Sequence, residues 1–194
     1  MPHKAGFVSI IGKPNVGKST LMNALVGEKM AIITPKAQTT RHRILGIVNE
    51  LDYQIVFSDT PGVIKPVYGM QKSMMDFVNG SLVDADVVLF VTDINEKYDE
   101  NDVIEKLKKV ESPVVVVINK IDKSSEELVK GKINYWQNLL NPSAIFATSA
   151  LHDHNVSAVM QFVLDHLPEH PAYYDKDILT DRSERFFVSE IIRE

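Results

Sequence analysis

The sequence contains no cysteine among its 194 residues, which excludes a disulfide framework and any cysteine-ligated metal site. A reducing cytoplasm fits this composition. No apolar run approaches the roughly 20 residues that a membrane-spanning helix requires, and the N-terminal residues lack the profile of a signal peptide. We therefore expect a cytoplasmic protein. Peripheral association with the inner membrane stays open, although the acidic balance gives no reason to expect it.

The sequence has fewer basic than acidic residues, 21 against 26, which argues against some classes of function. The formal net charge is −5, so the global field of the chain does not favour nucleic-acid binding, although a local basic patch is compatible with it. The six histidines are scattered, without the paired spacing of a metal site. With 44% hydrophobic and 24% charged residues, the composition is that of one globular domain with a small appendage.

Apolar runs alternate with amphipathic, helix-like segments along most of the chain. Several runs are continuous and β-branched, such as residues 87–91 and 114–118. Unbroken apolar strands are typical of a sheet covered on both faces, and alternating strands and helices indicate right-handed parallel crossovers. The sequence therefore predicts an α/β fold, a doubly wound, mostly parallel six-stranded sheet with helices on both faces. The expected strands are residues 5–11, 44–48, 53–58, 86–92, 113–118 and 143–148.

The first motif, G-K-P-N-V-G-K-S at residues 12–19, follows a predicted strand and precedes a predicted helix. It is a complete phosphate-binding loop, in which glycines let the backbone N–H groups curl toward phosphate oxygens. Lys18 would reach the β- and γ-phosphates, and the Ser19 hydroxyl would bind Mg²⁺. The loop alone also fits kinases and ATPases. Its predicted nucleotide contacts are Gly12, Asn15, Val16, Gly17, Lys18, Ser19 and Thr20.

A second motif, D-T-P-G at residues 59–62, closes another predicted strand. Asp59 is placed to hold Mg²⁺, usually through water, and the Gly62 N–H can meet the γ-phosphate. An ordinary turn would also favour these residues. Together with the phosphate-binding loop, the motif indicates a nucleotide site.

Between these motifs lies the polar stretch 36–41, which has no strong pattern. A threonine here would place its hydroxyl on Mg²⁺ only while the γ-phosphate is present, and we choose Thr40 over Thr39. Such a dependence makes a loop a switch. Residues 60–80 would form the second switch.

The motif N-K-I-D at residues 119–122 ends an apolar strand and predicts the base. Guanine presents N1–H and N2–H₂ side by side, and the Asp122 carboxylate can accept both. Adenine would leave that carboxylate unpaired, at a cost on the order of 1–3 kcal/mol or more. Asn119 would tie the loops together, and the aliphatic stem of Lys120 would lie along the base. The chain is therefore predicted to bind GTP and GDP.

A shorter motif, S-A-L at residues 149–151, follows the last predicted strand. Three residues of this kind are a weak signal alone, but their position suits a guanine contact. We expect the backbone N–H of Ala150 to donate to guanine O6, with Ser149 and Leu151 beside it.

These four motifs occur in the order of translation-factor-related GTPases. Residues 36–43 and 179–186 are more specific and resemble the Era family of bacterial ribosome-assembly GTPases, and the similarity covers essentially the entire chain. The resemblance implies a Mg²⁺-dependent, GTP-hydrolysing switch that gates binding to small-subunit ribosomal RNA in 30S assembly. In that family the nucleotide state positions a second, RNA-binding KH domain against the GTPase domain.

Val63 stands where Ras-like enzymes carry the glutamine that orients the attacking water. Valine cannot do this, so we expect slow intrinsic hydrolysis, and no residue is a safe candidate for a general base. The resemblance points to relatives with an apolar residue here and an asparagine matching Asn15, in which K⁺ neutralises developing charge. We carry K⁺ over as a hypothesis. The predicted catalytic residues are Lys18, Asn15, Thr40 and Gly62.

The resemblance divides the chain into a GTP-binding domain, residues 1–167, and a segment 168–194. Pro168 and Pro171 break the last helix and open a loose linker. The apolar tail that follows is the expected start of a KH domain not contained here, and it would be disordered, fold back or pair with another molecule. We expect a monomer that binds nucleotide well and RNA weakly.

Two alternatives stay open. The chain could be a guanine-nucleotide sensor with negligible turnover, which Val63 makes credible. It could also be the GTPase domain of a tRNA-modification enzyme, although the run at residues 179–186 speaks against this. Hydrolysis rates with and without K⁺ and RNA separate the sensor from the switch.

Overall fold

The structure is a computed structural model that describes residues 2–27, 44–62, 80–96 and 101–181, together with residues 185, 188 and 192. Its strands are β1 (Lys4–Ile11), β2 (Ile44–Asn49), β3 (Tyr53–Asp59), β4 (Val87–Asp93), β5 (Val114–Asn119) and β6 (Ala144–Ala147). Its helices are α1 (Lys18–Val26), α3 (Asn101–Leu107), α4 (Glu126–Leu140) and α5 (Val156–His166), with single 3₁₀ turns η1 (Ile121–Lys123) and η2 (Ala150–His152).

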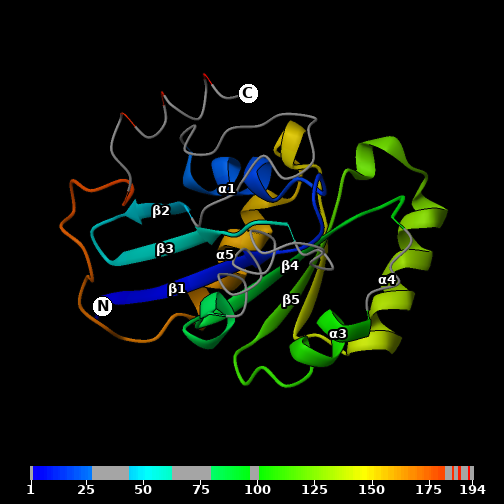
Figure 1. Ribbon diagram of the computed structural model, residues 1–194, viewed down its shortest axis with the longest axis horizontal. Helices are drawn as coiled ribbons and strands as arrows, with labels where there is room; N and C mark the ends of the chain where they lie inside the picture. The colour runs from blue at the N-terminus through cyan, green and yellow to red at the C-terminus, as the bar shows by residue number, and fades with distance from the viewer. Residues whose placement is uncertain are drawn as a thin grey trace.

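The six strands form one sheet in the order β2-β3-β1-β4-β5-β6 (Figure 1). Only the edge strand β2 runs antiparallel, against β3, and every other neighbouring pair is parallel. Each strand begins and ends within one residue of its predicted range. The predicted doubly wound, mostly parallel α/β sheet is therefore confirmed.

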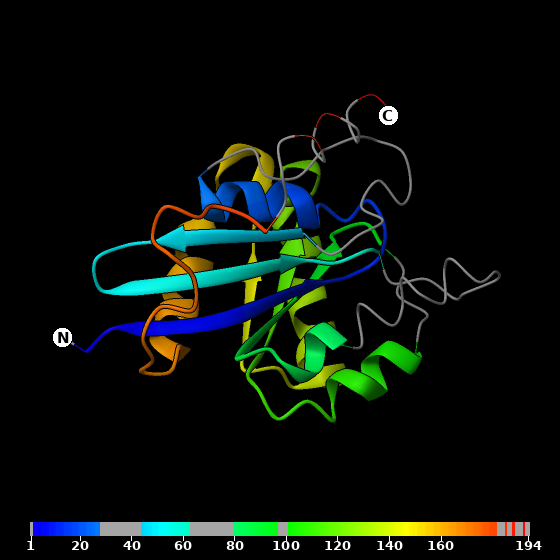
Figure 2. The same cartoon turned by 60° about the vertical axis from the view of Figure 1, so that its left-hand side comes forward.

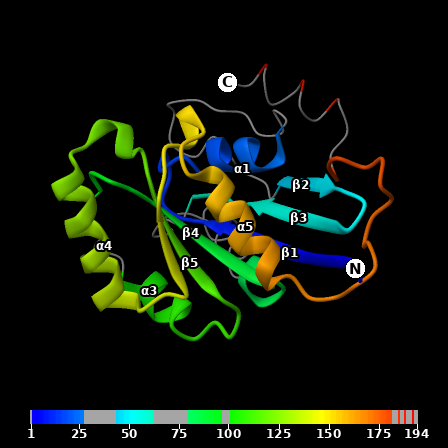
Figure 3. The same ribbon diagram turned by 180° about the vertical axis from the view of Figure 1, so that it is seen from behind.

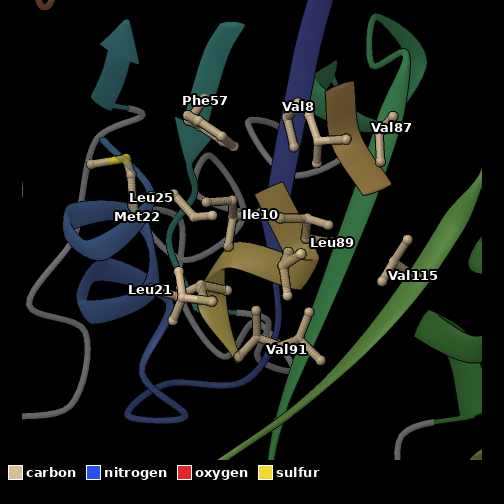
Figure 4. Packing of buried hydrophobic residues seen from close by; sticks show 14 of the residues in the cluster. Val8, Ile10, Leu21, Met22, Leu25, Phe57, Val87, Leu89, Val91 and Val115 are labelled. Atoms are coloured by element: carbon tan, nitrogen blue, oxygen red, sulfur yellow. The ribbon is translucent and has the colours of Figure 1, made fainter. Parts of the chain in front are cut away.

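Helices cover both faces of this sheet, and the strands supply a separate apolar core to each face. Successive residues of a strand point to opposite faces, so on β4 the side chains of Val87, Leu89 and Val91 join the core beneath α1 and α5. The intervening Val88 and Phe90 join the core beneath α3 and α4. Figure 3 shows α5 lying across the first face, and Figure 4 shows side chains of α1 meeting those of β1, β3 and β4 there.

Residues 168–181, here called the strap, run from the end of α5 along the β1–β3–β2 side of the sheet (Figure 2). The strap starts beside β1, where the Ala5 N–H donates to the Pro168 carbonyl at 3.2 Å. Tyr174 and Ile178 then pack against a small apolar cluster formed by β2 and β3. The segment expected as a loose linker is thus bonded to the sheet along much of its length.

One side chain, Gln54 on β3, holds the middle of the strap. Gln54 is fully buried, and its Oε1 accepts from the Tyr173 N–H at 2.7 Å and the Tyr174 N–H at 3.0 Å. Its Nε2 donates to the Tyr174 carbonyl at 2.8 Å and to Asn49 Oδ1 at 2.6 Å. The amide therefore satisfies strap backbone groups much as a neighbouring strand would.

The far end of the strap covers the edge of β2. The Ile47 N–H donates to the Leu179 carbonyl at 2.8 Å, and the Leu45 N–H donates to Asp181 Oδ1 at 3.2 Å. An edge strand otherwise presents unpaired N–H groups that attract other chains. The strap therefore occupies backbone N–H groups of the edge strand β2.

Beyond the strap, the structure describes single residues of the tail. Val188 and Ile192 are helical and expose 55% and 79% of their surface. That the tail is disordered, folds back or pairs with another molecule stays a prediction. Phe186, Phe187 and Ile191 lie outside the described residues. Within the described part of the chain, none of the helices has the length and apolar character needed to cross a membrane.

Candidate nucleotide-binding site

The predicted motifs gather at one edge of the sheet. The phosphate-binding loop follows β1, Asp59 ends β3, Asn119 ends β5 and the S-A-L turn follows β6. Because these strands are parallel, their carboxyl ends meet at the same edge, which is where doubly wound sheets bind ligands. All predicted site residues lie there except Thr40, which falls outside the described residues together with Thr39, Val63 and most of the expected second switch.

The backbone of the phosphate-binding loop needs glycine where two segments touch. Gly17 has φ 100°, and a Cβ atom on it would collide with the Asn119 side-chain amide. A Cβ on Gly62 would lie 2.6 Å from Pro14 Cγ, so the D-T-P-G segment also closes directly onto the loop. Helix α1 begins at Lys18 with no side chain capping its first N–H groups. Uncapped N–H groups at a helix start are suited to an anion.

Lys18 is buried in the loop, with 6% of its surface exposed. Its Nζ donates to the Lys13 carbonyl at 2.9 Å. Burial lowers the pKa of Lys18 to about 8, although the nearby charges of Asp59 and Glu96 favour its charged form. Because the effect of burial outweighs these two charges, the Lys18 ammonium favours a further anionic partner.

Two side chains with oxygen atoms suited to a metal ion, Ser19 and Asp59, contact each other near Lys18. The Ser19 hydroxyl donates to Asp59 Oδ2 at 2.7 Å, and Asp59 is fully buried. The neighbouring Thr60 hydroxyl donates to the Ile10 carbonyl at 2.8 Å, which ties the D-T-P-G segment to β1. Mg²⁺ prefers oxygen ligands, so the Ser19 hydroxyl and the Asp59 carboxylate would together hold this ion.

Asn119 joins three loops through its buried side chain. Its Nδ2 donates to the Val16 carbonyl at 3.0 Å, in the phosphate-binding loop. Its Oδ1 accepts from the Ala150 N–H at 3.0 Å and from the Thr148 hydroxyl at 3.4 Å. The Ala150 N–H, which we expected to face guanine O6, thus points to Asn119 in this structure, because the 3₁₀ turn η2 directs it inward.

Lys120 connects the base motif to the phosphate-binding loop. It adopts a left-handed conformation with φ 65°, and its Nζ donates to the Asn15 carbonyl and pairs with Asp93 Oδ2 at 2.8 Å. The side chain of Lys120 therefore contacts the phosphate-binding loop, and the placing of its stem along the base stays a prediction. Sequence reasoning missed Asp93, whose only signal was its position at the end of β4.

Asp122 presents an accessible carboxylate next to the S-A-L turn. The Ser149 hydroxyl donates to Asp122 Oδ1 at 2.6 Å, and this hydrogen bond lowers the pKa of Asp122, helped by the nearby charges of His152 and Lys123. A carboxylate held in its ionised form can accept two donors of a ligand. The orienting role of Ser149 was also missed, because the motif suggested only its backbone.

A second carboxylate that the sequence did not single out is Glu96, in the turn after β4. Its Oε1 lies 3.3 Å from Lys13 Nζ, and its side chain is 13% exposed. Glu96 thereby links this turn to the phosphate-binding loop. No motif could have indicated it, because the pairing joins residues far apart in the chain.

A phosphate-binding loop after β1, an aspartate after β3 and N-K-x-D after β5, on a sheet of this order, define a GTPase domain of the phosphate-loop class. Comparison with known families agrees, since the family described as 50S ribosome-binding GTPase matches residues 7–120. The chain belongs to this family.

Within it, the chain is similar to proteins named GTPase Era. The relative from Staphylococcus haemolyticus is 44% identical over 194 residues, and the relative from Alkaliphilus metalliredigens is 41% identical over 196 residues. The resemblance to Era stated from the sequence is therefore confirmed. The two alignments cover 99% and 100% of this chain but only 65% and 66% of the relatives, so the chain spans about two thirds of their length.

Solved structures support the same likeness. Era in complex with MgGDPNP and nucleotides 1506–1542 of 16S ribosomal RNA has a TM-score of 0.91 to this chain at 40% identity, covering 99% of it and 66% of that protein. A variant of Aquifex aeolicus Era bound to GDP·AlF4⁻ has a TM-score of 0.89, also at 40% identity, covering 98% and 66%.

Proposed function

We propose that this chain binds GTP and GDP with Mg²⁺ and hydrolyses GTP slowly, as a molecular switch. The observation that carries the proposal is the Asp122 carboxylate, which accepts a hydrogen bond from the Ser149 hydroxyl at 2.6 Å. Guanine N1–H and N2–H₂ supply the two adjacent donors that such a carboxylate accepts. Because the Ala150 N–H is already donated to Asn119, Leu151 of turn η2 would lie at the guanine O6 side.

On the phosphate side, backbone amides of residues 12–20 and the buried Lys18 ammonium would hold the β- and γ-phosphates. The Gly62 N–H would contact the γ-phosphate, since its segment touches Pro14. The Ser19–Asp59 pair fits Mg²⁺, with Thr40 as a further proposed ligand in the GTP state. When bound, Mg²⁺ neutralises charge on the phosphate oxygens.

We propose that hydrolysis needs K⁺ because Val63 cannot orient a water. Asn15 supports this through its resemblance to relatives that use K⁺, and it lies exposed in the loop with φ 62°. Replacing K⁺ by Na⁺ at constant ionic strength should slow turnover. Equal rates in both salts would remove the K⁺ requirement and leave GTP binding untouched.

The proposed role of the switch is to gate binding to small-subunit ribosomal RNA during 30S assembly in the cytoplasm. Its support is the 40% identity to the Era structure that holds both MgGDPNP and a 16S ribosomal RNA segment. Residues 1–167 would form the GTP-binding domain, and residues 168–194 would lead toward an RNA-binding KH domain. We therefore expect this chain, as a monomer, to bind RNA weakly.

The test is a titration of fluorescent GDP and ADP analogues, with Mg²⁺, against the wild type and Asp122→Ala. Binding of GDP alone, lost in the variant, would support the guanine assignment. Equal binding of both nucleotides, or no effect of the substitution, would overturn it. Multiple-turnover assays with GTP then separate a GTPase from a nucleotide sensor, which would bind GTP and leave it intact.

A further inference from the structure

The turn after β4 carries Glu96, whose side chain and backbone form hydrogen bonds to three other residues. Glu96 Oε2 accepts from the Thr92 hydroxyl at 3.2 Å, and Thr92 is fully buried. The Glu96 N–H donates to the Asp93 carbonyl at 3.0 Å, and Lys132 on α4 donates to the Glu96 carbonyl. The side chain and backbone of Glu96 are therefore both fixed.

This carboxylate reaches the phosphate-binding loop through Lys13. The Lys13 Nζ lies 3.3 Å from Glu96 Oε1, and only 17% of the lysine side chain is exposed. Exposed ion pairs contribute little to the stability of a protein, because water screens the charges and the side chains stay mobile. This pair differs, since both partners are largely covered and the acid is already held by Thr92.

The backbone of Lys13 in turn holds Lys18. The Lys13 carbonyl accepts a hydrogen bond from Lys18 Nζ at 2.9 Å. The side chain of Lys13 thus forms an ion pair with Glu96 Oε1 that is not aligned as a hydrogen bond, while the Lys13 carbonyl accepts from the ammonium that the proposed function assigns to the β- and γ-phosphates. Glu96 also acts on Lys18 through space, since its charge opposes the lowering of the pKa of Lys18 by burial.

We propose that Glu96 is a positioning residue for phosphate binding, which holds the Lys13 peptide so that its carbonyl keeps Lys18 directed at the β-phosphate. The inference rests on the proposed function and adds a residue outside the sequence motifs. Glu96 would not touch the nucleotide. Its effect should therefore appear only with ligands that carry a β-phosphate.

The experiment measures the affinities of GDP and GMP, with Mg²⁺, for the wild type, Glu96→Gln and a control, Glu105→Gln. Glu105 is a surface glutamate on α3 that pairs with Lys108, and 61% of its side chain is exposed. We expect Glu96→Gln to weaken GDP about five- to tenfold and to leave GMP within about twofold, because the guanine contacts are unaffected. The control should leave both affinities unchanged.

A double-mutant cycle tests whether Lys13 and Glu96 act on GDP affinity through the same contact. Lys13→Met should weaken GDP to a similar extent, and Lys13→Met with Glu96→Gln should be no weaker than either single variant, because both remove one link. Additive losses would overturn the proposal, as would equal losses of GDP and GMP. A gain in GDP affinity in Glu96→Gln would also overturn it, since the carboxylate would then be repelling phosphate.

The outcomes separate this inference from the function on which it rests. A wild type that binds GDP, together with a Glu96→Gln variant that binds it equally well, would overturn the role of Glu96 and leave the proposed function standing. A wild type without affinity for GDP would overturn the proposed function and the role of Glu96 with it. Cooperative thermal unfolding of each nucleotide-free variant verifies that folded proteins are compared.

Discussion

The guanine side and the phosphate side of the site are held together by different kinds of contact. On the guanine side, Asn119 makes buried hydrogen bonds to Val16 and Ala150, and Ser149 orients Asp122. On the phosphate side, charged lysines are anchored, with Lys13 paired with Glu96 and Lys18 bonded to the Lys13 carbonyl.

The difference has a physical meaning for recognition. Hydrogen bonds from fixed amides and hydroxyls are directional, so they place Asp122 well enough to distinguish one base from another. Charge acts over a longer range and with less directionality, which suits phosphates shared by all nucleotides. Substitutions on the guanine side should therefore change specificity, whereas those on the phosphate side should change affinity and its pH dependence.

The largest expected effect is on the guanine side, with Asp122→Asn. The amide offers one acceptor and one donor in place of two acceptors, so GDP affinity should fall on the order of 1,000-fold. Xanthosine diphosphate carries a carbonyl where guanine has its amino group and should bind the variant better than it binds the wild type. Competition titrations with both nucleotides test this, with Asp165→Asn on the exposed side of α5 as the control. An unchanged preference for GDP would contradict the role of Asp122.

Asn119→Ala should lower the stability of the three loops that form the guanine side. The variant leaves the Val16 carbonyl and the Ala150 N–H without their partner, so it should lower the free energy of unfolding by about 2–4 kcal/mol. GDP and xanthosine diphosphate should weaken together, without a change in preference. Urea unfolding measures the stability, and Asn119→Asp, which sets a buried carboxylate oxygen against the Val16 carbonyl, should be no more stable than Asn119→Ala. Full stability of Asn119→Ala would show that the three loops do not depend on this side chain.

The phosphate side should respond to pH through Lys18. Because burial lowers the pKa of Lys18 to about 8, the ammonium is charged at neutral pH and loses its proton as the pH rises through 8. Phosphate binds the charged form, so affinity should be constant below about pH 7 and fall about fourfold between pH 7 and 8.5. Isothermal titration with GDP measures it, and Lys18→Arg should show no such fall because guanidinium stays protonated. A flat wild-type profile would place the pKa higher.

The smallest effect on nucleotide affinity is expected from the strap, which lies away from both sides. Gln54→Leu leaves the Tyr173 and Tyr174 N–H groups without their acceptor, so stability should fall by about 1–3 kcal/mol. GDP affinity should stay within about twofold of wild type. Hydrogen exchange at these two amides should speed up, and Gln161→Leu on the exposed side of α5 is the matched control. A large loss of GDP affinity would mean that the strap is coupled to the site.

Much of the fold followed from local patterns. Apolar runs, several of them continuous and β-branched, predicted all six strands within one residue of their observed ends, because the strands of a sheet covered on both faces carry apolar side chains on both faces. The expected linker at residues 168–181 was different. Its sequence has turn residues but no periodicity, and its order comes from Gln54, Ile47 and Leu45 on distant strands. No local pattern indicates such a partner.

The sequence by itself determined the fold class and predicted the guanine base and the phosphate contacts, because contiguous residues at the ends of predicted strands carry that chemistry. The tertiary structure decided which groups hold those residues in place. Asp93 and Glu96 meet lysines 27 and 83 positions away in the chain, and the Ala150 N–H turned toward Asn119. Contacts between distant segments form only when the sheet brings strand ends together. Their geometry depends on packing, so no residue spacing in the sequence predicts them.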